Sequence, residues 1–266
     1  KHCLVDYIEQ YDIPAPLTFR PRSYDEALAL RDRLPYPVLL KPRGEAGGRG
    51  IRCAHNPKEL ESALSQQKPI PLIQEYIEGD DLVLNVLCLH GEPLAVSAYR
   101  VLRKYPLPFG PPIACRTIKD DALEHLGIKF LRKLRYHGFA NLDFRMDRRD
   151  GQPKLLEFNP RLSETVEISV RSGVNFPLML YKLALGEQVA PCFAYDVGLE
   201  FRWLLYGEIL HLMSTRDKGK TIRNLLKTRR FSTNVSLRDP LPHLVEGAII
   251  VVRGFSGLLG HRKPIP

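Results

Sequence analysis

Residues 139–164 read FANLDFRMDRRDGQPKLLEFNPRLSE and carry the clearest strand and turn signals of the chain. Residues 141–146 alternate polar and apolar side chains, which is typical of a half-buried strand. Arg149-Asp150-Gly151 is a turn signal, because Asp-Gly tolerates the positive φ angles that tight hairpins need. Residues 154–159 form the returning strand. The stretch therefore predicts a β-hairpin.

The polar side chains of this hairpin are expected to gather on one face. Side chains two residues apart in a strand share a face, so Glu157 and Asn159 point the same way and Arg161 follows just beyond. Asp143 lies on the partner strand and can meet them. Two carboxylates and an amide are oxygen ligands that suit Mg²⁺. On composition alone, a hairpin face that carries only solvated charges explains the pattern equally well.

The segment LLEFNPRLS resembles the metal-binding strand of the ATP-grasp superfamily, where Glu-x-Asn-x-Arg follows an acidic residue on the preceding strand. The resemblance implies that Asp143, Glu157 and Asn159 hold Mg²⁺ or Mn²⁺. It also implies that Arg161 is catalytic and stabilises charge that develops at the reaction centre. Asp143 stands where many relatives have the longer Glu.

A second motif, PVLLKPRGEAGGRGI, covers residues 37–51 and joins a buried strand to a glycine-rich loop. Glycines let backbone N–H groups approach phosphates, although a flexible hairpin loop would look similar. The spacing is neither Walker A nor Gly-x-Gly-x-x-Gly. The motif resembles the ATP-binding small lobe of ATP-grasp proteins, where the loop closes over the triphosphate. The resemblance assigns phosphate binding to Lys41, Gly47, Gly48 and Gly50, and a catalytic role to Lys41.

Residues 71–81, PLIQEYIEGDD, read as a strand followed by a turn at Gly79. They resemble the hinge between the two lobes of ATP-grasp proteins. The resemblance implies that Glu75, Tyr76 and Ile77 line the adenine and that Asp81 binds the ribose hydroxyls. Asp80 is the alternative for the ribose, because the two acids are adjacent.

The first ten residues predict a helix with Leu4, Tyr7 and Ile8 on one face. This opening also resembles ATP-grasp proteins, in which a helix begins with a Lys that reaches the ATP phosphates. Lys1 matches that Lys. Family members normally carry a further N-terminal domain before this point, so we expect either a fragment or one half of a split enzyme.

Other elements follow from periodicity and capping. Ser23 and Glu26 form a capping-box pattern at the start of a helix that runs to about Leu34. A proline-rich loop is expected over residues 103–112. The cations around it, Arg100, Arg103 and Arg116, either bind an anion or form surface salt bridges. Further helices are expected at 57–66, 121–136 and 178–185, and strands at 82–89 and 94–102.

Composition limits the class of protein. A chain of 266 residues with 44% hydrophobic and 26% charged residues is typical of a soluble globular protein. We find no signal-peptide pattern and no apolar run that could span a bilayer, so we expect a cytoplasmic protein with no membrane contact. Five scattered cysteines without a Cys-x-x-Cys pair argue against disulfides and against a zinc site.

The net charge is +9, and seven Lys or Arg residues lie between Arg216 and Arg230. Such a stretch can bind a polyanion, but a solvated helix face is the commoner explanation. No aromatic residues interleave with these cations, so we do not expect nucleic-acid binding.

The resemblance predicts an α+β ATP-grasp fold whose two lobes clasp ATP. The ATP-grasp domain is expected over 1–195, with a small lobe at about 18–76 and a large lobe at about 77–195, followed by an extension at 196–266. The implied reaction is Mg-ATP-dependent activation of a small carboxylate as an acyl phosphate for attack by an amine. An ATP-binding module without turnover and a bicarbonate-using, carbamoyl-phosphate-synthase-like enzyme are the alternatives. A homodimer and a separate N-terminal domain or subunit both stay open.

Overall fold

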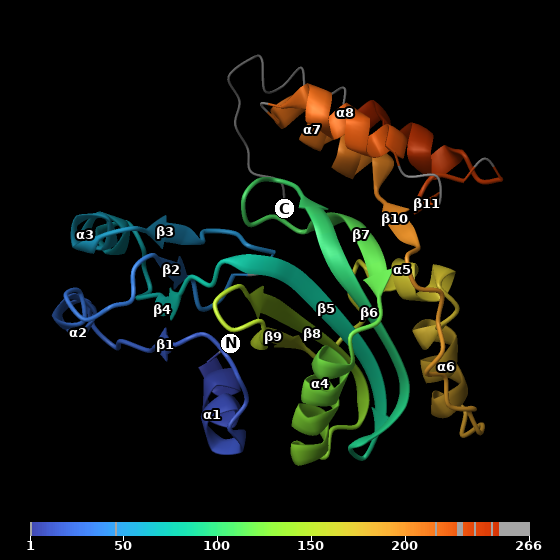
Figure 1. The fold of residues 1–266 in the computed structure, drawn as a ribbon, viewed down its shortest axis with the longest axis horizontal. Coiled ribbons are helices and arrows are strands. Elements are labelled where there is room, and N and C mark those ends of the chain that lie inside the picture. Colours follow the sequence, from blue (N-terminus) through green and yellow to red (C-terminus); the bar gives the residue numbers. More distant parts are fainter. Residues whose placement is uncertain are drawn as a thin grey trace.

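The computed structural model describes residues 2–45, 47–215, 217–227, 231–236, 238–245 and 247–249 (Figure 1). Within this part of the chain, two separate sheets are flanked by helices. This confirms the predicted α+β architecture. None of the helices in these ranges is both long and apolar enough to cross a membrane.

The smaller sheet has four strands and lies toward the N-terminal end of the chain. Its order is β1-β4-β2-β3, and every pairing is antiparallel. Leu40, Leu60 and Ile73 form the centre of its core and are fully buried. The elements of this region are β1 (Thr18–Phe19), α2 (Tyr24–Ala29), β2 (Val38–Lys41), β3 (Arg52–Ala54), α3 (Pro57–Ser65) and β4 (Leu72–Glu75).

The larger sheet has seven strands in the order β11-β10-β7-β6-β5-β8-β9. Its central strands are β5 (Gly79–Leu89), β6 (Glu92–Lys104), β7 (Pro112–Ile118), β8 (Gly138–Asp147) and β9 (Pro153–Asn159). One face packs against α4 (Asp121–Lys133) and α1 (His2–Tyr11). The other face is partly covered by α5 (Val166–Arg171) and α6 (Phe176–Ala184). Figure 1 shows α5 and α6 at the end of the larger sheet that lies away from the smaller sheet.

The predicted hairpin is formed by β8 and β9. Asp143 pairs with Glu157 and Asn141 pairs with Asn159, but Phe144 pairs with Leu155. The extra residue, Leu156, forms a β-bulge that interrupts the alternation of faces. Because of this bulge, Leu155 and Phe158 both pack on the α4 side, although they are three residues apart.

The helix predicted from Ser23 to about Leu34 is shorter than expected. The Oγ of Ser23 accepts from the backbone N–H of Glu26, as the capping pattern predicts. The Glu26 carboxylate, however, accepts from the N–H of Arg22 rather than from that of Ser23. The helix ends at Ala29 because the following residues close i→i+3 turns that bring Leu34 into the core.

The extension beyond residue 196 adds two strands to the larger sheet. β10 (Glu200–Arg202) pairs antiparallel with β7, and β11 (Phe231–Thr233) pairs parallel with β10. Between them lie η1 (Leu204–Ile209), a π-helical segment, followed by α7 (Leu210–Ser214) and α8 (Lys218–Lys227). We found no sequence signal for these strands because they are three residues long.

The three cations near the proline-rich loop all form ion pairs. Arg100 lies 3.0 Å from Asp80, Arg103 pairs with Glu208, and Arg116 pairs with Glu200. The structure therefore favours the salt-bridge interpretation of these cations. Two of the three pairs fasten the extension to β6 and β7. Part of the basic stretch lies on α8, whereas Arg216, Arg229 and Arg230 lie outside the described residues.

The turn of the hairpin is held by Asp147, whose side chain is 2% exposed. The N–H of Arg149 donates to its carboxylate, and the Arg149 guanidinium lies 2.7 Å from it. Arg149 also reaches Glu75 of β4 at 2.6 Å, which links the two sheets. Hydrogen bonds from the Arg149 side chain are the main reason that the pKa of Asp147 falls to about 2.

We predict that Asp147→Asn lowers the free energy of unfolding by about 1 kcal/mol at pH 6, because a charged hydrogen-bond partner is lost. A carboxylate with a lowered pKa stabilises the fold above its usual pKa, and this stabilisation disappears as the pH falls toward 2. Urea unfolding at several pH values measures the difference. Asp150→Asn in the same turn is the control, since Asp150 is exposed and its ion pair with Lys154 contributes little. An Asp147→Asn effect that stays constant from pH 6 to pH 2.5 would contradict the prediction.

Candidate functional site

The face of the larger sheet that α5 and α6 partly cover carries the predicted acidic residues. The register pairs Asp81 of β5 with Arg145 of β8, and Val83 of β5 with Asp143. Because alternate residues share a face, Asp81 and Asp143 lie on the same side of the sheet. Asp143 in turn pairs with Glu157. The strands thus bring the predicted metal and ribose residues onto one surface.

Burial and the neighbouring Glu157 carboxylate change the pKa of Asp143. Burial of Asp143, and next to it the Glu157 carboxylate, raise the pKa of Asp143 to about 7, although Lys104 and Lys41 oppose the shift. Asn159 lies beside them, and its Nδ2 donates to Asp143 at 3.3 Å. A divalent cation would relieve the repulsion between these carboxylates, so the donor set fits Mg²⁺.

This donor set is small. In the part of the chain that the structure describes, no three His, Cys, Asp or Glu side chains are grouped so that they could hold a metal. Asp143, Glu157 and Asn159 together offer two carboxylates and one amide oxygen. Mg²⁺ is commonly held by one or two carboxylates together with substrate phosphates and water. The site therefore fits a metal that arrives with a phosphate ligand better than a metal enclosed by protein alone.

A cavity of about 250 Å³ lies between the glycine-rich loop and β9. Lys41, Gly47 and Gly48 line it from the smaller sheet, and Glu157 lines it from β9. The rest of the lining is mostly apolar and comes from α1, residues 15–18, Ile51, β4 and β9. Four of the residues predicted from sequence thus border one space, where a cationic amine and an acidic side chain both lie.

The backbone conformation of the glycine-rich loop requires glycine at several positions. Gly47, Gly48 and Gly50 have φ angles of +63°, +76° and +67°, which side chains rarely adopt. A Cβ atom on Gly48 would lie 1.8 Å from the carbonyl oxygen of Phe109. Phe109 belongs to the proline-rich loop between β6 and β7, so the two loops touch across the opening between the sheets.

The predicted adenine segment is tied to its surroundings. The Glu75 carboxylate accepts from the backbone N–H of Leu17 at 3.1 Å, and the N–H of Tyr76 donates to the Pro37 carbonyl. Arg145 donates to the carbonyl of Ile77 at 3.1 Å. The Glu75 side chain therefore supports the hinge, and a base bound here would use other backbone groups of the segment.

The two candidate ribose residues lie in different surroundings. Asp81 is about one-fifth exposed and lies between Lys104 at 2.6 Å and Arg145 at 2.8 Å. Asp80 points to the opposite face, where it pairs with Arg100. Only Asp81 shares the face of the carboxylate pair, so the geometry favours Asp81 of the two.

The structure does not join the predicted residue Arg161 to this cluster. The exposed Arg161 donates to the carbonyl of its neighbour Leu162, and it lies in the segment that follows β9. Lys1 lies outside the described residues.

Sequence reasoning missed Lys104 and Arg145. Both flank Asp81, and Arg145 also lies 5.8 Å from the ring of Tyr76. Arg145 could have been found, because it stands two residues after Asp143 on the same strand and therefore on the same face. Lys104 could not, because its position depends on the pairing of β6 with β5.

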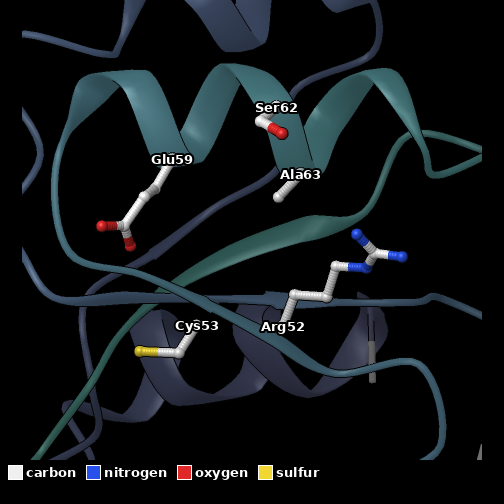
Figure 2. A pocket seen from close by; sticks show the side chains of 5 residues that line it. All are labelled: Arg52, Cys53, Glu59, Ser62 and Ala63. Carbon is white, nitrogen blue, oxygen red and sulfur yellow. The ribbon is translucent and has the colours of Figure 1, made fainter.

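A second hollow, of about 390 Å³, lies on the smaller sheet between β3 and α3 (Figure 2). Arg52 and Cys53 border it from β3, and Glu59, Ser62 and Ala63 border it from α3. Burial, and then the nearby Glu59, raise the pKa of the Cys53 thiol. A thiol that resists ionisation is a poor nucleophile, so this hollow offers no reactive group.

Comparison with known families identifies the architecture. Residues 67–204 match the family described as "ATP-grasp in the biosynthetic pathway with Ter operon". The chain belongs to this ATP-grasp family. Residues 4–70 match the ATP-binding domain of the carbamoyl-phosphate synthase L chain. The predicted ATP-grasp fold is thereby confirmed.

Individual relatives share little sequence identity with this chain. A carbamoyl phosphate synthase large chain from Gemmatimonas aurantiaca is 27% identical over 197 residues, which cover 67% of this chain and 17% of the relative. The biotin carboxylase of Campylobacter jejuni, solved with a β-γ-ATP ligand, has a TM-score of 0.61 at 18% identity and covers 73% of this chain and 48% of its own. An N5-carboxyaminoimidazole synthetase from Staphylococcus aureus with ADP has a TM-score of 0.61 at 14% identity, covering 72% and 52%. The chain thus spans about half the length of these solved relatives.

The contact between Gly48 and Phe109 gives a test of the closed ATP-grasp loop. We predict that Gly48→Ala opens the loop, since the added methyl group cannot share space with the Phe109 carbonyl. Trypsin should then cleave after Arg49 several-fold faster than in the unmodified protein. Gly44→Ala is the matched control, because a Cβ atom there meets nothing within 4 Å. Equal cleavage rates in the two variants would show that the contact does not hold the loop.

Proposed function

We propose that this chain binds Mg-ATP and uses it to activate a carboxylate as an acyl phosphate, which an amine then attacks. The observation that carries the proposal is that Glu157, which pairs with Asp143, borders the same cavity as Lys41 and the glycine-rich loop. Membership of the ATP-grasp family supports the use of ATP. The relatives support the reaction class, since one is an L-amino acid ligase from Bacillus licheniformis, 20% identical with a TM-score of 0.55.

Each part of the site has a role in this proposal. Lys41 and the backbone N–H groups near Gly47, Gly48 and Gly50 would bind the phosphates. Glu75, Tyr76 and Ile77 would lie along the adenine, and Asp81 would bind the ribose. Asp143, Glu157 and Asn159 would hold Mg²⁺ or Mn²⁺, which when bound neutralises phosphate charge. Lys1 would be a further phosphate ligand.

The chemistry has two steps. A carboxylate oxygen of the substrate attacks the γ-phosphorus, the bond from that phosphorus to its bridging oxygen breaks, and ADP leaves with the electron pair. The amine nitrogen then attacks the acyl carbon, inorganic phosphate leaves, and the nitrogen loses a proton to water. Both steps develop negative charge on oxygen, which Lys41 and Arg161 would stabilise.

The domain arrangement is also a proposal. We assign ATP-grasp lobes to residues 18–76 and 77–195 and treat 196–266 as an extension. We propose that a separate domain or subunit, or a second copy of the chain, completes the substrate pocket. The carbamoyl phosphate synthase relative favours bicarbonate as an alternative substrate.

The proposal is tested by ADP release from Mg-ATP with a panel of amino acids and other small carboxylates, in the presence of hydroxylamine. Hydroxylamine traps an acyl phosphate as a hydroxamate, so we expect both products with at least one carboxylate. Glu157→Gln should lower the rate by about 100-fold or more. Glu92→Gln, at the exposed start of β6, is the control and should leave the rate unchanged.

Two outcomes would contradict the ligase proposal. Stimulation by bicarbonate alone, without hydroxamate from any carboxylate, would favour the carboxylase-like alternative. Binding of Mg-ATP without stimulation by any member of the panel would favour an ATP-binding module without turnover.

A further inference from the structure

A chain of buried polar side chains runs across the larger sheet from the candidate metal residues to α5. Nδ2 of Asn159 donates to Oδ1 of Asn141 at 3.4 Å, and Nδ2 of Asn141 donates to Oδ1 of Asn85 at 2.8 Å. Nδ2 of Asn85 then donates to Oγ of Ser169 at 3.0 Å. Ser169 in turn hydrogen-bonds Ser97 at 2.6 Å. The chain therefore links β9, β8, β5 and α5.

The surroundings of this chain are apolar. Asn85, Asn141 and Ser169 are at most 3% exposed. On β5, Asn85 stands between Val83 and Leu87, which share its face and belong to two hydrophobic clusters. Because apolar side chains flank Asn85 on this face, a buried position here does not by itself require an amide side chain. Buried polar groups that are fully hydrogen-bonded instead fix one arrangement of side chains.

The direction of the hydrogen bonds fixes the orientation of the Asn159 amide. Its Nδ2 donates both to Asn141 Oδ1 and to the Asp143 carboxylate. A carboxylate that binds a cation is ionised and can only accept, so with the cation bound a reversed amide would set its oxygen against that of Asp143. In the observed orientation, Oδ1 is the remaining atom of Asn159, and it is the only atom of an amide side chain that binds a hard cation.

We infer that Asn141 and Asn85 are positioning residues that hold the Asn159 amide with its Oδ1 available to the cation of the site. Asn141 contacts Asn159 directly, and Asn85 fixes the orientation of Asn141. This inference rests on the proposed function, because it assumes that Asn159 binds the cation. Groups that orient a metal ligand commonly change metal affinity by about 10-fold to 100-fold when they are removed.

The test compares two affinities in each variant. Calorimetry gives the affinity for a non-hydrolysable ATP analogue without metal, and electron paramagnetic resonance gives the affinity of the analogue-bound protein for Mn²⁺. In Asn141→Leu we expect the Mn²⁺ affinity to fall by about 10-fold or more, and the metal-free nucleotide affinity to stay within about twofold. General damage to the fold would lower both affinities together.

Thr117→Val is the matched control. Thr117 is a buried hydroxyl on β7 that hydrogen-bonds Asp196 and Leu199, away from the polar chain. Its loss should lower stability without changing the Mn²⁺ affinity. Asn141→Ser is the milder variant if Asn141→Leu does not fold. Its shorter side chain cannot bridge Asn85 and Asn159, so it carries the same expectation.

Wild-type Mn²⁺ affinity in the folded Asn141 variant, together with loss of that affinity in Glu157→Gln, would overturn the inference and leave the proposed function standing. Unchanged Mn²⁺ affinity in both the Asn141 variant and Glu157→Gln would contradict the metal site itself, and the inference with it.

Discussion

The pairing of β8 with its two neighbours is the constraint on which the site depends. Leu142 and Phe144 are buried against the helices on one side, so Asp143 must face the other side. A slip of one residue would turn Asp143 toward α4 and bring apolar side chains to the face that carries the candidate site. The register is therefore strongly specified. The bulge at Leu156 lets β9 satisfy the same core while Glu157 stays opposite Asp143. The same strand register therefore satisfies both the packing of the core and the geometry of the site.

Three contacts join the regions of the two sheets close to the candidate site. Arg149 joins the hairpin turn to Glu75, Arg145 holds the carbonyl of Ile77, and Gly48 meets Phe109. These three contacts lie at the hinge and at the loops, so they set how the smaller sheet sits over the carboxylate pair.

Local patterns predicted much of this structure, and long-range pairing set the rest. The hairpin, the helix caps and the glycine-rich loop follow from residues close in sequence, such as Asp150-Gly151 and Ser23 with Glu26. The early end of α2 and the bulge at Leu156 depend on core packing that a single sequence does not display. The roles of Lys104 and of strands β10 and β11 depend on distant partners in the sheet. For the same reason, the sequence predicted a site role for Asn159 but not for Asn141 and Asn85, which are linked to it by hydrogen bonds.

We propose that the carboxylate pair and Lys41 act on one Mg-nucleotide. Calorimetric titration of a non-hydrolysable ATP analogue, with and without Mg²⁺, tests it most directly when unmodified protein is compared with Glu157→Gln and Lys41→Ala. We predict that Mg²⁺ strengthens binding to the unmodified protein, that Glu157→Gln abolishes this gain, and that Lys41→Ala weakens binding about 10-fold under both conditions while the gain persists. Binding that ignores Mg²⁺ in the unmodified protein, or that is unchanged in both variants, would contradict the account.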